Sequence, residues 1–434
     1  MKKTVKKALS VAAISAMAIG AFAGTSFNGN SAEAGSTYNP KGKAKNVIFM
    51  IPDGYSASYA TNYRWFKGEE SAMDSILVGM HRTYSANSKV TDSAAAGTAM
   101  ATGVKTNNGM ISTSPDGEEL KTILETVEEK GKATGLVATS TITHATPAVF
   151  ASHVPTRADE AGIAPQLIEN GVDVILGGGK RYFPDALLTE AKQDGYNVVS
   201  DKSALASSVG KSDKLIGLFA SDALAPELDR DETNEPSLAE MTQSALDVLK
   251  KDKDGFFLMV EGSQIDWAGH DNDAAWAMKD SEAFEKAVEK ALAFAKKDKN
   301  TLVVIAGDHD TGGMSVGNAN VEVLRNITAT GDFMASKLDA NRSNVKNVVK
   351  QYTGLDVTDA EAAKIQSAKD AGIAINQLVS ERARVGWATT DHTGVDIPVY
   401  AFGPGADLFR GLLENTDFPE LMAEAMKLKY GKQK

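Results

Sequence analysis

Short apolar runs that recur along the whole chain constrain its fold more than any other feature. Each is bounded by glycine or charge, as buried strands usually are. They lie at residues 46–51, 134–139, 172–176, 256–260, 302–306 and 399–402. Helix-like stretches lie between them, at residues 118–129, 238–250 and 274–297. This alternation predicts an α/β fold with a central, mostly parallel sheet sandwiched by helices.

One segment breaks this rhythm. Residues 318–384 are polar and only weakly periodic. We interpret them as an insertion rather than as an independent domain, so that residues 40–434 form a single catalytic domain.

The start of the chain has the pattern of an export signal. Four lysines precede an alanine-rich apolar run at residues 8–23, and small-residue cleavage patterns follow at residues 21–23 and 32–34. A membrane anchor needs about 20 apolar residues, and this run is shorter and interrupted by glycine. We therefore expect residues 1–34 to be a signal and propeptide-like segment, cut at either position, with no membrane span afterwards. The protein is expected in the periplasm, at the cell surface or outside the cell.

Charge and cysteine content exclude several classes of function. The formal charge is −11, and loss of the four signal lysines takes it to −15. A chain with this much negative charge is repelled by nucleic acids and anionic membranes. An anionic substrate would therefore need positive charge within its binding site. The chain has no cysteine, which excludes disulfides, thiolate ligands and a cysteine nucleophile.

Acidic residues and histidines cluster just after the predicted strands, where open α/β sheets bind their ligands. They are Asp53, Glu261, Asp266, His270, Asp308, His309 and His392. Any one of these carboxylates alone is more simply a helix cap or a turn residue. Together they favour a metal cluster, because oxygen and imidazole ligands suit Zn²⁺ at mixed sites and Mg²⁺ at an all-oxygen site.

The stretch VTDSAAAGTAMATG, residues 90–103, surrounds Ser93 with small residues. Two explanations are open at this point: tight packing, or a hydroxyl that a ligand must approach closely.

Five motifs carry a family resemblance. They are DSAAAGTA (92–99), ATPAVFASHVPTR (145–157), VEGSQIDWAGH (260–270), AGDHDTGG (306–313) and DHTG (391–394). In this order, over nearly the whole chain after the signal, the sequence resembles the bacterial alkaline phosphatases.

The resemblance implies two Zn²⁺ and one Mg²⁺ per chain. It implies one zinc held by Asp266, His270 and His392, and a second held by Asp53, Asp308 and His309. The magnesium would share Asp53 and be held also by Thr146 and Glu261. Three such ions bring about +6 against about −4 from the carboxylates, so the site stays positive enough for a dianion.

The resemblance also implies a reaction and an assembly. Ser93 matches the nucleophile, Arg157 the phosphate clamp, and Asp92 a residue that holds Arg157. A serine hydroxyl is a poor nucleophile unless a base or a metal activates it. The implied activity is metal-dependent hydrolysis of phosphate monoesters to an alcohol and phosphate through phosphoserine, at alkaline pH and with a broad substrate range. The implied assembly is a homodimer, with an interface or a lid expected in residues 318–384.

Two residues depart from the enterobacterial enzyme, which has Asp and Lys beside the magnesium site. This sequence has His144 and Trp267 there. A further imidazole could favour Zn²⁺ or another transition metal at the third site, or His144 could simply pack on Trp267 while water mediates magnesium binding. His153, four residues before Arg157, either supports that arginine or packs in the fold.

Rival functions remain. A sulfatase needs Cys or Ser followed by Pro and Arg, but Ala95 and Gly97 stand at those positions. A phosphodiesterase stays open, because specificity depends on the loops around a site. A phosphate or zinc scavenger would bind without turnover and would have no use for Ser93.

Overall fold

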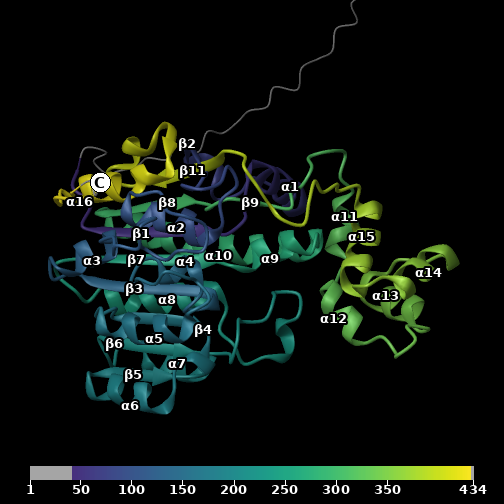
Figure 1. Ribbon diagram of the computed structural model, residues 1–434, viewed down its shortest axis with the longest axis horizontal. Coiled ribbons are helices and arrows are strands. Elements are labelled where there is room, and N and C mark those ends of the chain that lie inside the picture. The colour runs from purple at the N-terminus through teal and green to yellow at the C-terminus, as the bar shows by residue number, and fades with distance from the viewer. Residues whose placement is uncertain (1–41, 432–434) are drawn as a thin grey trace, which may run out of the picture. The chain divides into compact units, whose positions relative to one another are not determined.

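A ten-stranded sheet forms the centre of residues 42–431, the part of the chain that this computed structural model describes (Figure 1). The strand order is β12-β2-β11-β8-β1-β7-β3-β4-β6-β5. The strands are β1 (Asn46–Pro52), β2 (Leu77–Arg82), β3 (Ala133–Thr141), β4 (Val174–Gly178), β5 (Tyr196–Val199), β6 (Lys214–Leu218), β7 (Phe256–Gly262), β8 (Thr301–Ala306), β11 (Ile397–Phe402) and β12 (Gly411–Glu414). Only β11 runs antiparallel to its neighbours β2 and β8, so the prediction of a mostly parallel sheet is confirmed. The export signal predicted for residues 1–34 lies outside the described residues.

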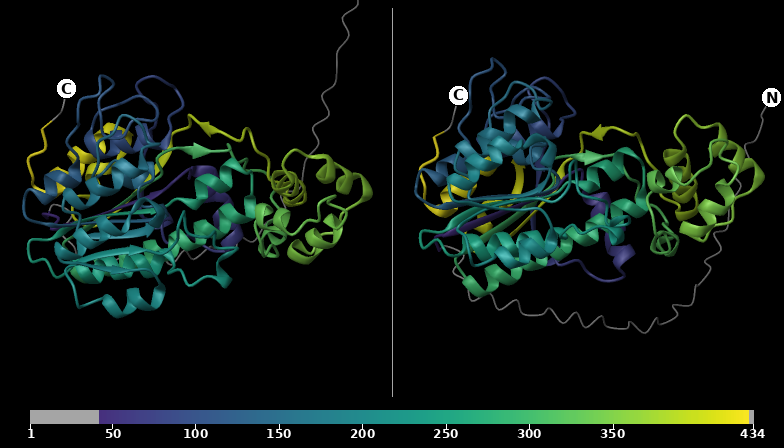
Figure 2. Two further views of the ribbon diagram at one scale, coloured as in Figure 1. Left: turned by 60° about the horizontal axis from the view of Figure 1, so that its bottom comes forward. Right: turned by 90° about the horizontal axis from the view of Figure 1, so that it is seen from below.

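Helices cover both faces of this sheet (Figure 2). Along β1, Ile48 and Met50 join one hydrophobic cluster, while Val47 and Phe49 join the other, because successive side chains of a strand point to opposite faces. The first cluster includes residues of α1 (Ala57–Lys67), α7 (Lys202–Ser208), α8 (Leu238–Leu249) and α10 (Ala274–Asp298). The second includes residues of α2 (Ser93–Thr102), α3 (Ile123–Glu128), α4 (Ala145–Ala148), α5 (Glu160–Glu169), α6 (Asp185–Gln193) and α16 (Phe418–Met426).

The helix predicted at residues 118–129 is shorter than expected. It begins at Ile123, because Thr122 and Glu125 form a capping box that starts the helix there. Before it, Thr113 and Glu119 pair as an isolated antiparallel bridge. The helical spacing of residues 118–122 was therefore misleading.

The segment predicted as an insertion folds into short helices between β8 and β11, which are neighbours in the sheet. The helices are α11 (Val321–Arg325), α12 (Gly331–Ser336), α13 (Val345–Thr353), α14 (Asp359–Ser367) and α15 (Ala371–Ala383). Met334, Val345 and Ile375 belong to a small hydrophobic cluster of its own. Side-chain caps fix several helix starts, including the capping box of Thr358 and Glu361. On each side of the insertion lies one strand of a small antiparallel pair, β9 (Asp310–Thr311) and β10 (His392–Thr393).

Among the described residues, no helix combines the length and the apolar character that crossing a bilayer requires.

Candidate active site

The acidic residues predicted at strand ends meet at the carboxyl edge of three adjacent strands. Asp53 directly follows β1, Glu261 lies near the end of β7, and Asp308 follows β8 by two residues. Since the order β8-β1-β7 makes these strands neighbours, the sheet itself brings the three carboxylates together. All three are buried.

Asp266, His270 and His392 form the first group of potential ligands. Asp266 and His270 lie one turn apart on α9 (Gln264–His270), and β10 supplies His392. Nε2 of His270 and Nε2 of His392 each lie 3.4 Å from Asp266 Oδ1, and 3.1 Å from each other. Their Nδ1 atoms donate to the carbonyl oxygens of Thr390 and Thr91, at 2.6 and 2.9 Å. When these imidazoles are neutral, two nitrogen lone pairs and a carboxylate converge on one point, which suits a cation.

The pKa shifts of these three side chains reflect an environment that favours positive charge. Burial opposes protonation of His270, but hydrogen bonding to Asp266 outweighs it and raises the pKa of His270 to about 9. The pKa of His392 is raised in the same way, and that of Asp266 is held well below its usual range by the two histidines despite burial. Without a metal, protons would supply the missing charge.

Asp53, Asp308 and His309 form the second group. His309 Nε2 lies 3.1 Å from Asp308 Oδ2 and 3.5 Å from Asp53 Oδ1. These two carboxylate oxygens have no hydrogen-bond partner among the described residues. Burial and then the neighbouring Asp308 charge raise the pKa of Asp53, and burial raises that of Asp308 to about 6. Buried carboxylates without a counter-charge are costly, so this group also fits a metal ion.

Oxygen atoms form a third group beside Asp53. Thr146 Oγ1, on α4, lies 3.2 Å from Asp53 Oδ2. Glu261 accepts a 3.1 Å hydrogen bond from Ser140 through Oε2, while its Oε1 lacks a partner among the described residues. Burial raises the pKa of Glu261 to about 7. An all-oxygen set of this kind suits Mg²⁺.

Ser93 begins helix α2, and the small residues after it serve two purposes. Asp92 caps the helix by accepting a 3.0 Å bond from Ala95 N, which places Ser93 Oγ 3.1 Å from His309 Nε2. The helix is buried throughout, and a Cβ at Gly97 would lie only 2.9 Å from Val149 Cγ2. The structure therefore supports the tight-packing explanation, and it places the Ser93 hydroxyl beside His309.

Two neighbours hold the guanidinium of Arg157. Nη1 donates to Asp92 Oδ2 at 3.1 Å, and Nη2 lies 2.9 Å from Nε2 of His144. Because an arginine only donates, His144 Nε2 must accept. Burial, and then the Arg157 charge, lower the pKa of His144 to about 4, which keeps that nitrogen unprotonated. The His144 ring also packs edge-on against Trp267, with centroids 5.8 Å apart.

The other histidines have structural partners. His153 Nε2 lies 2.7 Å from Glu125, and its Nδ1 lies 2.9 Å from the Ser112 carbonyl oxygen. His153 is thus bound within the fold, as the packing alternative predicts. His81 is buried, with Nε2 2.8 Å from the Gly307 carbonyl oxygen.

Sequence reasoning missed the residues that orient the potential ligands. Thr311 hydrogen-bonds to Asp266 and lies 3.3 Å from His309 Nδ1, and Ser140 bonds to Glu261. Thr311 stands two residues after His309 in a quoted motif, but nothing in the sequence sets its hydroxyl apart from the many others. The carbonyl groups of Thr91 and Thr390 carry no signal, because every residue has one.

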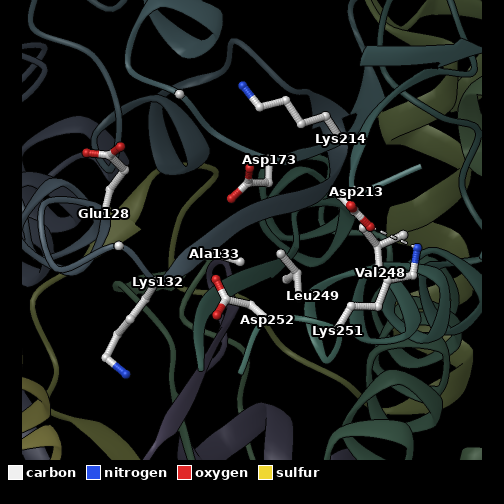
Figure 3. A pocket seen from close by; sticks show the side chains of 12 residues that line it. Glu128, Lys132, Ala133, Asp173, Asp213, Lys214, Val248, Leu249, Lys251 and Asp252 are labelled. Carbon is white, nitrogen blue, oxygen red and sulfur yellow. Dashed lines mark hydrogen bonds and ion pairs between the residues drawn. The ribbon is translucent and has the colours of Figure 1, made fainter. Parts of the chain in front are cut away.

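A separate pocket lies at the amino ends of the strands, at the opposite end of the sheet from Asp53, Glu261 and Asp308 (Figure 3). It has a volume of about 420 Å³ and is lined by charges of both signs, including Asp173, Lys214 and Asp252. The pocket lies at the start of β4 and β6. It is therefore distinct from the site at the carboxyl ends of the strands.

Comparisons with known proteins identify the family of the chain. Residues 44–428 match the alkaline phosphatase family. Alkaline phosphatase 3 of Bacillus subtilis is 44% identical over 98% of each chain. The crystal structure of Thermus thermophilus alkaline phosphatase is 32% identical with a TM-score of 0.83, covering 91% of this chain and 94% of that one. A mutant of TAB5 alkaline phosphatase, solved with Mg bound in its M3 site, is 30% identical with a TM-score of 0.70, covering 89% and 99%. The chain belongs to the alkaline phosphatase family, whose members are metal-dependent hydrolases.

Proposed function

We propose that this protein hydrolyses phosphate monoesters to an alcohol and inorganic phosphate, with Ser93 as the nucleophile. The observation that carries the proposal is the position of Ser93 Oγ, 3.1 Å from His309 Nε2 and at the start of a helix. The hydroxyl thus lies beside potential metal ligands. It also lies at a helix N-terminus, where free backbone N–H groups and the helix dipole stabilise bound anions. Such a position suits a group that attacks phosphorus.

The metal assignment follows the three groups. One Zn²⁺ would be held by Asp266, His270 and His392, and the other by Asp53, Asp308 and His309. One Mg²⁺ would share Asp53 and be held also by Thr146 and Glu261. When bound, zinc supplies Lewis-acid stabilisation of the oxygens that enter and leave phosphorus.

The third site is best assigned to magnesium. His144 uses Nε2 to accept from Arg157 and packs on Trp267. The other ring nitrogen, Nδ1, is buried and has no hydrogen-bond partner among the described residues, so we base the magnesium assignment on the oxygen ligands of Asp53, Thr146 and Glu261.

Arg157 and Ser93 have different roles toward the phosphoryl group of the substrate. Arg157, held by Asp92 and His144, keeps further N–H groups free to donate to the phosphoryl oxygens. Ser93 Oγ forms a bond to phosphorus as the bond to the alcohol oxygen breaks, giving phosphoserine. Water then displaces Ser93 and releases phosphate. Because these residues address the phosphoryl group, the range of alcohols is expected to be broad, and the optimum is expected to be alkaline.

The test is hydrolysis of p-nitrophenyl phosphate by the purified protein after removal of metals with a chelator. Activity should vanish on stripping and return at two zinc ions per chain, with a further rise on adding Mg²⁺. Ser93→Ala should abolish turnover while zinc content is retained. No hydrolysis at any metal loading would refute the proposal, and phosphate binding that survives in Ser93→Ala without any wild-type turnover would support a scavenger instead. Bis(p-nitrophenyl) phosphate, tested in parallel, measures phosphodiesterase activity.

We also propose that residues 40–434 act as one exported catalytic domain and that the protein is a homodimer. Leu77 is 55% exposed and stands at a cavity of about 490 Å³ that Met80, Pro398 and Ala60 also line. A two-fold interface brings the same patch of both subunits together, so Leu77 of each subunit would face this cavity of the other. Of the large hydrophobic residues described as exposed, none lies in residues 318–384. This favours the surface around Leu77, at the start of β2, over the insertion as the interface.

Size-exclusion chromatography with light scattering measures the molar mass of the protein in solution and so tests the dimer. Leu77→Asp should yield monomers, whereas Val316→Asp, at another exposed hydrophobic position, should remain dimeric. A wild-type monomer, or a Leu77→Asp dimer, would contradict the interface.

A further inference from the structure

Thr311 lies at the centre of the two metal groups. Its side chain is fully buried, and in the β9–β10 pair it stands directly opposite His392. Its hydroxyl contacts Asp266 Oδ1, which belongs to the first group. The same hydroxyl lies 3.3 Å from Nδ1 of His309, which belongs to the second.

The direction of these two hydrogen bonds is fixed by the number of protons. A hydroxyl has one proton to donate, and an ionised carboxylate only accepts, so Thr311 donates to Asp266. Thr311 Oγ1 can then only accept from His309, which places the ring proton on Nδ1. His309 Nε2 is left with its lone pair, and it is this atom that faces Asp53, Asp308 and Ser93 at 3.1–3.5 Å.

His309 differs in this respect from the other two histidines of the site. His270 and His392 are oriented by the backbone carbonyl groups of Thr390 and Thr91. The Nδ1 partner of His309 is a side chain, and that side chain also binds a ligand of the other group. A substitution can therefore remove the partner of His309, which is not possible for the backbone partners.

We propose that Thr311 is a positioning residue that couples the two metal groups through its hydroxyl. It fixes the metal-binding nitrogen of His309 and orients the carboxylate of Asp266 at the same time. This inference rests on the ligand assignment of the proposed function. Groups that hydrogen-bond to metal ligands typically change metal affinity by about 10- to 100-fold when removed, so we expect loss of the hydroxyl to weaken both zinc sites by such factors.

The backbone of Thr311 is anchored independently of its hydroxyl. Tyr59 donates a 2.6 Å hydrogen bond to the Thr311 carbonyl oxygen, and the β9–β10 pairing holds the strand. Thr311→Val keeps the shape of the side chain and removes the hydroxyl, while Thr311→Ser keeps the hydroxyl. Thr393→Val is the matched control, because Thr393 lies on the paired strand but donates to Asp310, at 2.6 Å.

The experiment measures zinc affinity by competition with a chromophoric chelator, starting from metal-free protein, so that no turnover is needed. Thr311→Val should weaken both zinc sites about 10- to 100-fold, Thr311→Ser should restore both to within a few-fold, and Thr393→Val should leave both unchanged. Weakening of one site alone, or equal weakening in Thr311→Ser, would overturn the coupling role of the hydroxyl.

Circular dichroism of each metal-free variant checks folding, and Thr311→Ala replaces the valine variant if the latter does not fold. Failure of this inference can be told apart from failure of the proposed function. If the wild type binds two zinc ions and hydrolyses p-nitrophenyl phosphate while Thr311→Val binds zinc equally well, only the coupling role is wrong. If the wild type neither binds two zinc ions nor hydrolyses the ester, the proposed function itself is wrong.

Discussion

At the scale of single residues, the partners of each side chain decide which atoms remain free for chemistry. Arg157 commits Nη1 to Asp92 and Nη2 to His144. A guanidinium has five N–H groups in a planar fork, so the remaining ones are presented at a fixed angle. A lysine ammonium in its place could not contact both neighbours and still address two phosphoryl oxygens.

Arg157→Lys should therefore lower kcat/KM for p-nitrophenyl phosphate by about 10- to 100-fold, as expected for loss of a charge-assisted hydrogen bond worth about 1.5–3 kcal/mol. Steady-state kinetics at fixed metal loading measure this change. The control is Arg181→Lys at an exposed arginine, which should have no effect. A change of less than about two-fold in Arg157→Lys would show that the fork is not needed.

The sequence predicted the chemically distinctive residues of the site but not their supports. Asp53, Glu261 and Asp308 could be located because several acidic residues follow predicted strands, and the carboxyl ends of parallel strands converge. Thr311 and Ser140 could not be distinguished from other hydroxyl residues, since their use depends on which atoms lie within 3–3.5 Å in the folded chain.

At the scale of elements, the position of Ser93 depends on how closely α2 packs. Gly97 contacts Val149 so tightly that a Cβ would approach Cγ2 to 2.9 Å. Alanine is the better helix former by about 1 kcal/mol, but overpacking a buried contact costs about 1–3 kcal/mol. The steric term should win here, because the whole helix is buried and has little room to move.

Gly97→Ala is thus expected to lower the free energy of unfolding and to reduce turnover by displacing Ser93. Val149→Ala should relieve the clash, so that the double variant is more stable than the sum of the two single effects predicts. Denaturant unfolding of the four proteins measures the coupling. Simple additivity would show that the contact does not constrain α2.

A second element-scale prediction concerns pH and the link between α3 and the segment before Arg157. Burial opposes protonation of His153, yet its hydrogen bond to Glu125 raises its pKa above the usual 6.5, and the pKa of Glu125 is lowered in turn. A raised histidine pKa gives stability that is fully present below pH 6.5 and is lost as pH rises through the folded-state value. Below pH 4.5 that stability declines again as Glu125 gains its proton.

His153→Gln should therefore destabilise the protein by about 1 kcal/mol more at pH 6 than at pH 9.5, the difference between a charge-assisted and a neutral hydrogen bond. Thermal unfolding at the two pH values measures this. Glu125→Gln, which can still accept the capping bond from Thr122 N, should show the same pH dependence. Equal losses at both pH values would mean that the pair is neutral throughout.

The elements themselves were predictable to different degrees. The central strands were located within a few residues, because a strand buried on both faces must be apolar throughout. The helix at residues 118–129 was too long, since spacing alone does not show where a capping box begins a helix. The helices of residues 318–384 were missed because α11 to α14 have only 5 to 9 residues each and because the buried face of α15 includes polar and small residues such as Asn376 and Ser380.

At the scale of the whole molecule, stability cannot come from disulfides, because the chain has no cysteine. The large core clusters on the two faces of the sheet supply most of it. Against them stand four buried carboxylates, Asp53, Glu261, Asp266 and Asp308, gathered at one edge. Their mutual repulsion and desolvation oppose folding unless cations are bound.

Metal removal should accordingly lower the melting temperature. A ligand present at 100 times its Kd stabilises the folded state by about 2.7 kcal/mol, so two or three sites contribute about 5–8 kcal/mol. Differential scanning calorimetry with and without chelator measures this, and a reducing agent serves as the control that should have no effect. An unchanged melting temperature after verified metal loss would contradict the expectation.

Asp308→Asn should change the melting temperature in opposite directions in the metal-free and the zinc-loaded protein. Burial raises the pKa of the Asp308 carboxyl group to about 6, because its charged form is costly inside the protein. In the metal-free protein the neutral amide removes this cost, so the variant should melt at a higher temperature than the wild type. In the zinc-loaded protein it removes a ligand and should melt at a lower temperature. Calorimetry of both proteins in both states tests this crossing. A variant that is less stable in both states would show that hydrogen bonds from Gly54 N and His309 N to Asp308, rather than its charge, govern its contribution.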